Sequence, residues 1–94
     1  MIICDAIAGT LESSDILIQI FCVEDEAGIE IHLESAVIYQ FGEQIRKVIL
    51  SELQAAGVKS AKVRAVDRGA LDCTIIARMR TAISRASSIH NEQV

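Results

Sequence analysis

Residues 15–34, with the sequence DILIQIFCVEDEAGIEIHLE, decide the fold class of this chain. In residues 15–24 isoleucine recurs at alternate positions, and in residues 29–34 apolar residues alternate with Glu or His. A period of two is typical of β-strands, because successive side chains of a strand point to opposite faces. The acidic loop between the two segments contains Gly28, which suits a hairpin turn. The stretch therefore predicts two strands that pair as a hairpin.

Beyond this stretch the apolar period changes from two to about 3.6, which is typical of a helix. Ser35 is placed to cap the first turn, and Gly57 stands where helices commonly end in a left-handed residue. The pattern predicts a helix over residues 36–56. Its core-facing stripe comprises Val37, Phe41, Ile45, Val48, Leu53 and Ala56.

The C-terminal part of the chain predicts a second hairpin and a second helix. Residues 60–67 alternate, residues 67–70 supply a tight turn, and residues 71–79 alternate again. From about Arg80 the pattern becomes helical, and residues 90–94 form a polar, frayed tail. The predicted order β-β-α-β-β-α gives an α+β fold, a two-layer sandwich whose antiparallel four-stranded sheet carries the helices on one face.

The composition excludes several classes of protein. A chain of 94 residues with 51% hydrophobic and 23% charged residues forms one globular domain and not a disordered tail. Aromatic residues make up only 3% and the net charge is −4, so binding to nucleic acid is not expected. No run of about 18 apolar residues could span a membrane. The start MIICDAIAG has no basic residue ahead of its apolar stretch, unlike a secretory signal.

Three widely separated cysteines, Cys4, Cys22 and Cys73, form no C-x-x-C motif. An odd count of this kind argues against a disulfide framework and against a zinc knuckle. Cys22 and Cys73 fall on alternating apolar positions and are expected to be buried as small hydrophobic residues. The expected location is a reducing cytoplasm.

Charge is divided unevenly between the two halves of the chain. Residues 1–45 contain nine acidic residues and no Lys or Arg, whereas residues 46–94 contain nine basic and four acidic residues, giving −9 and +5. One interpretation is internal complementarity, with acidic strands beside basic ones. The other is an acidic docking surface for basic partners. Both interpretations remain open at this point, and they are compatible.

Glu30, His32 and Glu34 share one face of a predicted strand, and carboxylate and imidazole groups are metal ligands. Side chains two residues apart on a straight strand stand about 7 Å apart, too far to close on one ion. Pairing across strands with Lys62 or Arg64 is the better expectation. No metal site is predicted.

No cysteine or serine has a recognisable His and acid partner, so no catalytic residue is predicted. His90 lies in the polar tail and is expected to be solvated. Five arginines of the C-terminal half could form a phosphate or carboxylate site, or could form salt bridges with the acidic half. They are Arg64, Arg68, Arg78, Arg80 and Arg85.

Two hydroxyl groups, those of Ser13 and Ser14, stand between Glu12 and Asp15 ahead of the first strand. Side chains of this kind commonly satisfy backbone groups in turns. The functional alternative is an acceptor for covalent modification, which needs an exposed hydroxyl that no internal hydrogen bond occupies. We expect residues 1–14 to form an exposed arm that carries the acceptor serine.

Three ordered segments resemble the citrate lyase acyl carrier protein family, the gamma subunits of citrate lyase. The first is AGTLESSD at residues 8–15, which resembles the N-terminal signature of that family. The others are QFG at residues 40–42 and DRGALDC at residues 67–73, supported by Ile45, Ala77-Arg78 and Arg85-Ala86-Ser87. The resemblance covers nearly the whole chain and implies a single acyl-carrier domain over residues 1–94.

The resemblance implies a covalent cofactor, 2′-(5″-phosphoribosyl)-3′-dephospho-coenzyme A, joined to a serine through a phosphodiester. The family's acceptor follows the Glu of AGTLES, which is Ser13 here, and the next position varies between Ser and Gly, so Ser14 is the less favoured site. The carrier would shuttle acetyl and citryl thioesters between the transferase (alpha) and lyase (beta) subunits in a hetero-oligomer, without catalysing a step itself. A prosthetic-group transferase would load it.

Other functions remain open at the level of the sequence. The carrier subunit of malonate decarboxylase has a related prosthetic group, and a citramalate lyase carrier would share the same features. A small ligand-binding regulatory domain could have the same predicted fold. A stand-alone enzyme is the least supported class, because the sequence offers no residues for it.

Overall fold

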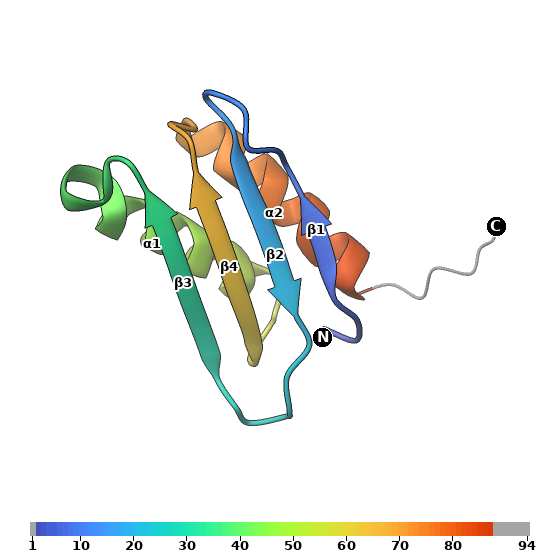
Figure 1. Cartoon of the computed structure of the whole chain (residues 1–94). Helices are drawn as coiled ribbons and strands as arrows, with labels where there is room; N and C mark the ends of the chain where they lie inside the picture. Colours follow the sequence, from blue (N-terminus) through green and yellow to red (C-terminus); the bar gives the residue numbers. More distant parts are fainter. Residues whose placement is uncertain (1, 88–94) are drawn as a thin grey trace, which may run out of the picture.

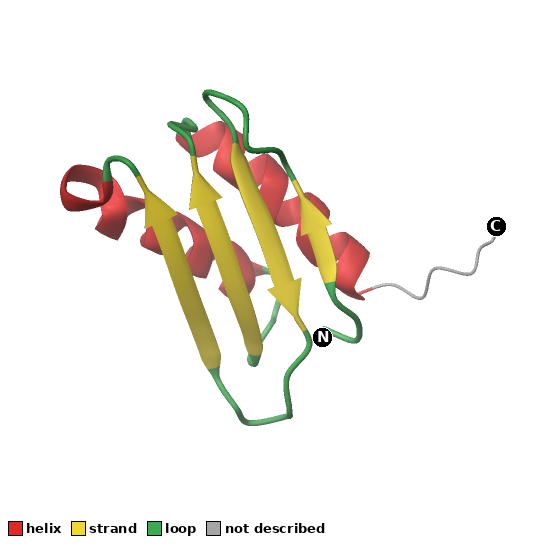
Figure 2. Cartoon of the chain, in the orientation of Figure 1, coloured by secondary structure: helices red, strands yellow, loops and turns green. Residues whose placement is uncertain are grey.

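The structure, a computed structural model, describes residues 2–87 and consists of one sheet with both helices on one face (Figures 1 and 2). Helix α2 packs on β1 and β2, and helix α1 packs on β3 and on α2. The elements in chain order are β1 (Ala6–Ala8), β2 (Ile16–Phe21), β3 (Ile29–Ser35), α1 (Ile38–Ala55), β4 (Ala61–Asp67) and α2 (Asp72–Ser87).

The strands lie in the order β1-β2-β4-β3. Strand β2 is antiparallel to both β1 and β4, whereas β3 and β4 are parallel. The predicted α+β sandwich with helices on one face is confirmed, but the predicted antiparallel sheet and the order β-β-α-β-β-α are wrong. The sheet is mixed and the order is β-β-β-α-β-α.

Helix α1 explains the parallel pair. Its 18 residues rise about 27 Å, close to the roughly 23 Å length of a seven-residue strand. The helix therefore returns the chain to the end of the sheet where β3 began, and β4 then runs in the same direction as β3. Strands β2 and β3 consequently form no hairpin, because β4 lies between them.

The predicted fourth strand, residues 71–79, is the first half of α2. Its alternation of apolar residues is also compatible with a helix, because short apolar runs fit both periods. The buried side chains of α2 follow the helical spacing and are Ile75, Met79, Ala82, Ile83 and Ala86. Cys73, which the strand would have buried, is exposed, and so is Cys22, which lies just beyond the end of β2.

The fourth strand of the sheet comes instead from the predicted exposed arm, residues 1–14. Strand β1 pairs with β2 in the register Ala6↔Ile20 and Ala8↔Ile18, and Ala8 is buried. The backbone N–H of Ile3 donates to the carbonyl of Ala86, which ties the start of the chain to α2. The arm is therefore exposed only in part. The predicted frayed tail, residues 90–94, and His90 lie outside the described residues.

The core lies between the sheet and the helices. It is formed by the inner faces of β2 and β4 and by one stripe of each helix, with Ile16, Ile18, Ile20, Val63, Ile49, Leu53, Ile75 and Met79 fully buried. The helix predicted over residues 36–56 is confirmed, and Gly57 has the predicted positive φ of 76°. Phe41, however, is 53% exposed, because Gly42 and Ile45 occupy the buried positions of that turn.

Ser35 is the last residue of β3 and does not cap α1, whose N-cap is Val37 without a side-chain hydrogen bond. The Ser35 hydroxyl donates instead to Oδ2 of Asp67 at 2.9 Å and accepts from the N–H of Val37 at 3.1 Å. Its side chain therefore joins β3 to β4 at the end of the sheet where the loop of residues 9–15 also lies.

Candidate functional site

The candidate site is the loop of residues 9–15, which connects β1 to β2 at one end of the sheet (upper end in Figure 1). We call it the serine loop. The N–H of Asp15 donates to the carbonyl of Glu12 at 3.2 Å, so Glu12–Asp15 is a β-turn with Ser13 and Ser14 at its centre. Ser14 has φ of 66°, as at the second central position of a type II turn.

The two serines differ in their backbone environment although both are exposed. The N–H of Ser14 donates to the carbonyl of Arg68 at 2.8 Å, and its left-handed backbone favours glycine. Ser13 lies at the first central position of the turn, where serine is unstrained. Among residues 2–87 neither hydroxyl has a hydrogen-bond partner. The loop thus presents the Ser13 hydroxyl to solvent with no competing internal contact.

Asp15 anchors the serine loop to the core. Its carboxylate forms a bidentate pair with Arg78 of α2, in which Oδ1 accepts from Nε and Oδ2 accepts from Nη2, each at 2.9 Å. Oδ1 also accepts from the N–H of Ile16 and Oδ2 from the hydroxyl of Thr10, each at 2.7 Å. All four contacts favour the charged carboxylate, which is only 8% exposed.

The same contacts govern the ionisation of Asp15. The hydrogen bonds from Arg78, and then that from Thr10, hold the pKa of the Asp15 carboxyl well below its usual range, against the opposing effect of burial. The pair also raises the pKa of Arg78. Asp15 therefore stays charged throughout the neutral range, and its charge is compensated inside the protein.

A neighbouring loop, residues 68–71 between β4 and α2, supports the serine loop from the side. The N–H of Arg68 donates to the carbonyl of Asp15 at 2.9 Å, so two backbone bonds join the loops beyond the end of the β2–β4 ladder. The carboxylate of Asp67, which is 2% exposed, accepts from the N–H of Ala70 at 3.0 Å. Buried carboxylates therefore fix both loops.

Gly9 sets the entry of the chain into the serine loop. Its φ is 91°, and a Cβ built there would lie 1.9 Å from the carbonyl oxygen of Ile16. Only glycine allows the loop to approach the start of β2 this closely. The glycine of the AGTLESSD segment is therefore required by the geometry of the loop.

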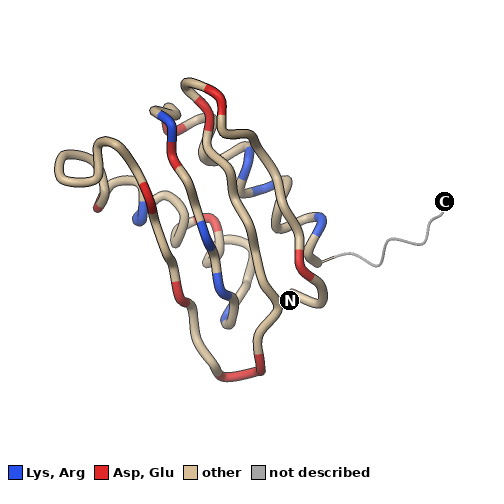
Figure 3. The backbone as a smooth tube through the Cα atoms, in the orientation of Figure 1, with Lys and Arg blue, Asp and Glu red and all other residues tan. Residues whose placement is uncertain are grey.

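The basic positions are spread over β4 and both helices (Figure 3), and the five arginines have different partners. Arg78 is held by Asp15, Arg80 by Glu52 at 2.9 Å, and Arg85 donates to the carbonyl of Ile7 at 2.8 Å. Arg64 bonds Gln19 and lies 3.6 Å from Glu34 across the sheet. The pairs of Arg64 and Arg78 join the basic half to the acidic half and support internal complementarity. Arg68 is exposed beside the serine loop and has no side-chain partner among residues 2–87.

The Glu30-His32-Glu34 row lies on the exposed face of β3. The imidazole of His32 contacts the carboxylate of Glu30 directly, closer than the straight-strand spacing predicts, and this contact lowers the pKa of Glu30. The predicted cross-strand pairing is confirmed between Glu34 and Arg64. Among the described residues no group of three His, Cys, Asp or Glu side chains is arranged to hold a metal ion.

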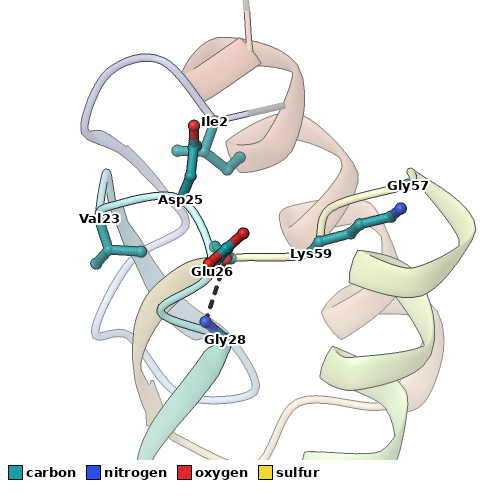
Figure 4. Close-up of a pocket in the computed structure, with 8 residues that line it drawn as sticks. Ile2, Val23, Asp25, Glu26, Gly28, Gly57 and Lys59 are labelled. Atoms are coloured by element: carbon teal, nitrogen blue, oxygen red, sulfur yellow. Dashed lines mark hydrogen bonds between the residues drawn. The ribbon is translucent and has the colours of Figure 1, made fainter.

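A hollow of about 530 Å³ lies at the other end of the molecule, between the β2–β3 loop and the α1–β4 loop (Figure 4). Its walls include Asp25 and Lys59, and the N–H of Gly28 donates to the hydroxyl of Ser60 at 3.1 Å. The hydroxyl of Ser60 accepts this backbone hydrogen bond, and none of the lining residues is a histidine that could act as its general base. It is separated from the serine loop by the length of the sheet.

The model of an acyl carrier protein family, described as the malonate decarboxylase delta subunit (MdcD), matches residues 4–86. The chain belongs to this family. Among curated relatives, the citrate lyase acyl carrier protein of Streptococcus mutans is 56% identical over 84 residues, which cover 89% of this chain and 81% of the relative. That of Lactiplantibacillus plantarum is 58% identical, covering 86% and 82%. The predicted resemblance to citrate lyase acyl carrier proteins is confirmed.

A solved structure shares the fold of this carrier. It is that of a Pseudomonas malonate decarboxylase hetero-tetramer in complex with malonate, and the matching chain has a TM-score of 0.65 at 14% identity. The match covers 88% of this chain and 84% of that chain. At this identity the likeness shows a common fold and no more.

The contacts that position Ser13 were not predicted from the sequence. Asp15 and Arg78 are 63 residues apart, and no local pattern pairs them. The sequence gives one indication of this pairing, which is that Asp15 and Arg78 both fall in segments that resemble the carrier family. Their pairing explains why a residue of α2 belongs with the acceptor signature.

Proposed function

We propose that this carrier is the acyl carrier subunit of citrate lyase and that 2′-(5″-phosphoribosyl)-3′-dephospho-coenzyme A is attached to Ser13. The observation that carries the proposal is the Ser13 hydroxyl, which is exposed at the tip of a turn and accepts or donates no hydrogen bond within residues 2–87. Relatives named as citrate lyase acyl carrier proteins support the choice of complex, since several of them are 49–58% identical to this chain over most of its length.

Ser13 fits a phosphodiester attachment chemically. Its Oγ would form a bond to phosphorus while a phosphoanhydride bond of an activated nucleotide donor breaks. The terminal phosphate or pyrophosphate of the donor would leave with the electron pair of that bond, and the hydroxyl proton would pass to the transferase or to water. No basic side chain of the described residues contacts this hydroxyl, so the base would come from outside this chain, from the transferase or from water. Once bound, the group provides a terminal thiol that carries acyl groups.

The charges near Ser13 suit an anionic attachment. The carboxylate of Asp15 is already compensated by Arg78, so it adds little repulsion toward a phosphodiester. The exposed guanidinium of Arg68 lies in the adjacent loop, tied to Ser14 and Asp15 through its backbone. Arg68 therefore brings positive charge near the attachment point.

The carrier contributes tethering and positioning. A group fixed to Ser13 is confined near the serine loop, which raises its effective concentration at any active site that docks there. We place the carrier in the cytoplasm in a hetero-oligomer with the transferase (alpha) and lyase (beta) subunits, loaded by a prosthetic-group transferase. No helix among residues 2–87 is long and apolar enough to cross a bilayer.

A carrier of malonate decarboxylase is the second candidate, favoured by the description of the matching family and by the shared fold of the decarboxylase chain. Purified partner subunits distinguish the two. The loaded carrier should support cleavage of citrate with citrate lyase subunits and should fail to support decarboxylation of malonate with decarboxylase subunits.

Intact-mass measurement tests the attachment. The chain is produced together with the maturation enzymes, as wild type, Ser13→Ala and Ser14→Ala. We expect the adduct on the wild type and on Ser14→Ala, and no adduct on Ser13→Ala. An adduct that persists on Ser13→Ala would reject Ser13 as the acceptor, and a wild-type chain that remains unmodified beside active maturation enzymes would reject the carrier function.

A further inference from the structure

Four large apolar side chains are exposed at the end of the molecule that carries the serine loop. Leu11 is 51% exposed, Phe41 53%, Leu71 71% and Tyr39 fully exposed. We propose that these four residues, called here the docking ring, form the surface on which the partner subunits seat when they receive the acyl arm. The inference rests on the proposed carrier function and names the surface and the kind of partner that function requires.

The docking ring is assembled from three segments that are distant in the sequence. Leu11 lies in the serine loop, Leu71 in the β4–α2 loop, and Tyr39 and Phe41 in the first turn of α1, all at the same end of the sheet (upper end in Figure 1). The serine loop and the β4–α2 loop share the backbone bonds of Arg68 described above.

A further contact connects the third segment to the second. Gln44 of α1 donates to the carboxylate of Asp72, the residue after Leu71, at 3.0 Å. The Ser35–Asp67 bond joins the ends of β3 and β4 directly beneath. The ring residues therefore project from a continuous, cross-braced end of the fold.

These four large apolar side chains are exposed and are not part of the buried core, so packing of the fold does not explain why they are apolar. Seven large apolar residues are exposed among residues 2–87, and four of them lie at this end. Grouped exposure of this kind typically marks a protein interaction site, whereas single exposed apolar residues need no explanation. Each of the three segments that resemble the carrier family contributes one of the ring residues Leu11, Phe41 and Leu71, so the resemblance includes side chains that the core does not use.

Charge at this end specifies the partner surface. Glu12, Glu43 and Asp72 are exposed around the ring, against the exposed base Arg68. A surface with an apolar centre and a net acidic rim is complementary to an active-site entrance that is apolar and bordered by Lys or Arg. Because an arm on Ser13 reaches only as far as its own length, a partner that uses it must approach this end of the carrier.

A ring of four side chains is small compared with a stable interface, which buries about 1,600 Å² in total. Weak docking is what the function requires, since the carrier must leave one subunit before it visits the next. The acidic rim would then speed association, while the apolar residues would set the lifetime of each complex.

Acyl transfer from the loaded carrier to purified transferase and lyase subunits tests this surface. The variants are Leu71→Ser, Tyr39→Ser and the double variant, with Leu50→Ser and Ile3→Ser as matched controls, because these two are exposed apolar residues outside the ring. Each sample is first shown by intact mass to carry the adduct. We expect KM for the carrier to rise about tenfold or more in the double variant with kcat nearly unchanged, and both controls to stay within about twofold of wild type.

Three results would overturn the inference while leaving the carrier function intact. KM could be unchanged in the double variant, or the controls could shift it equally. Alternatively, the wild-type carrier could sediment as a dimer that Leu71→Ser dissociates without any change of KM, which would assign the ring to a second copy of this chain. Loss of the adduct from the wild-type carrier would instead contradict the proposed function itself.

Glu12→Gln combined with Glu43→Gln tests the charged rim separately. We expect kcat/KM to fall several-fold at low salt and the salt dependence of KM to flatten, because the two carboxylates steer the carrier toward a basic surface. If the salt dependence of KM were unchanged, the partner surface would not be basic, and that part of the inference would be wrong.

Discussion

The two ends of the molecule are built differently, although both consist of loops that connect the same strands and helices. At the serine end, the carboxylates of Asp15 and Asp67 are buried and fully engaged with side chains and backbone of neighbouring loops. At the opposite end, Gly28 and Gly57 turn the chain in open space, and an open hollow separates the loops. Buried carboxylates fix the loops of the serine end, whereas backbone and hydroxyl hydrogen bonds join the loops of the opposite end around an open hollow.

This difference matches what a carrier needs. The acceptor hydroxyl must be exposed, yet two or more enzymes must find it in the same place. The loops of the opposite end are also joined by hydrogen bonds, such as that from the N–H of Ala61 to the carbonyl of Gly28, but the serine end adds the buried carboxylates of Asp15 and Asp67. Paired substitutions, one in the serine loop and one elsewhere in the fold, test this difference.

Glycine substitutions should show the largest contrast. Gly9→Ala places a Cβ against the carbonyl of Ile16 and forces alanine into positive φ, so we expect a loss of about 3 to 5 kcal/mol in the free energy of unfolding. Gly57→Ala meets no atom within 4 Å and should lose only about 1 to 2 kcal/mol from its φ. Urea denaturation of both variants measures the difference. Equal losses would show that the serine loop can move away and is not braced.

Ion-pair substitutions should give the next largest contrast. Asp15→Asn leaves the partly buried Arg78 without its carboxylate, and we expect a loss of about 2 to 3 kcal/mol in stability. Glu52→Gln removes the charge from a side chain that is 13% exposed, but its partner Arg80 is 72% exposed and one hydrogen bond joins them, so we expect a smaller loss of about 1 kcal/mol. Thermal unfolding with circular dichroism compares the two. A smaller effect at Asp15 than at Glu52 would contradict the anchoring role.

The pH dependence of stability follows from the same pair. Asp15 has a folded-state pKa below that of the unfolded chain, so its contribution is complete above an unfolded pKa of about 3.9 and is lost as the pH falls below it. We expect wild-type stability to fall below about pH 4, on through about pH 3 and lower, more steeply than that of Asp15→Asn. Urea midpoints across this range test the sign. Parallel curves would mean that another carboxylate dominates acid unfolding.

The sequence correctly predicted those strands and helices in which the period of the apolar residues is unambiguous. Strand β2, strand β3, helix α1 and strand β4 all lie where alternation or helical spacing placed them. The AGTLESSD segment also singled out Ser13 as the expected acceptor of the prosthetic group. This assignment stays a prediction. The exposure of the Ser13–Ser14 turn agrees with that assignment.

Other features depend on contacts that no local pattern contains. Residues 71–79 alternate as a strand would, but Cys73 and Ala77 on the predicted inner face are exposed, whereas Ile75, Met79 and Ile83 are buried at helical spacing. Strand β1 has three residues, too few to show a period, and is defined by its pairing with β2. The order of the strands follows from the path of α1, which local propensity does not determine.

Glycine substitutions at the two neighbouring serines should have the smallest effect on the free energy of unfolding. They test whether the backbone conformations of Ser13 and Ser14 differ in strain. Ser14→Gly relieves a serine with φ of 66° but adds freedom to the unfolded chain, so a net gain of about 0.5 kcal/mol is expected. Ser13→Gly relieves no such strain and should lose a similar amount. Chemical denaturation measures the stabilities, and intact mass should show the adduct kept on Ser14→Gly and absent from Ser13→Gly. If the two glycine variants behaved alike in both measurements, the turn would not distinguish the serines, and the choice of Ser13 would rest on family resemblance alone.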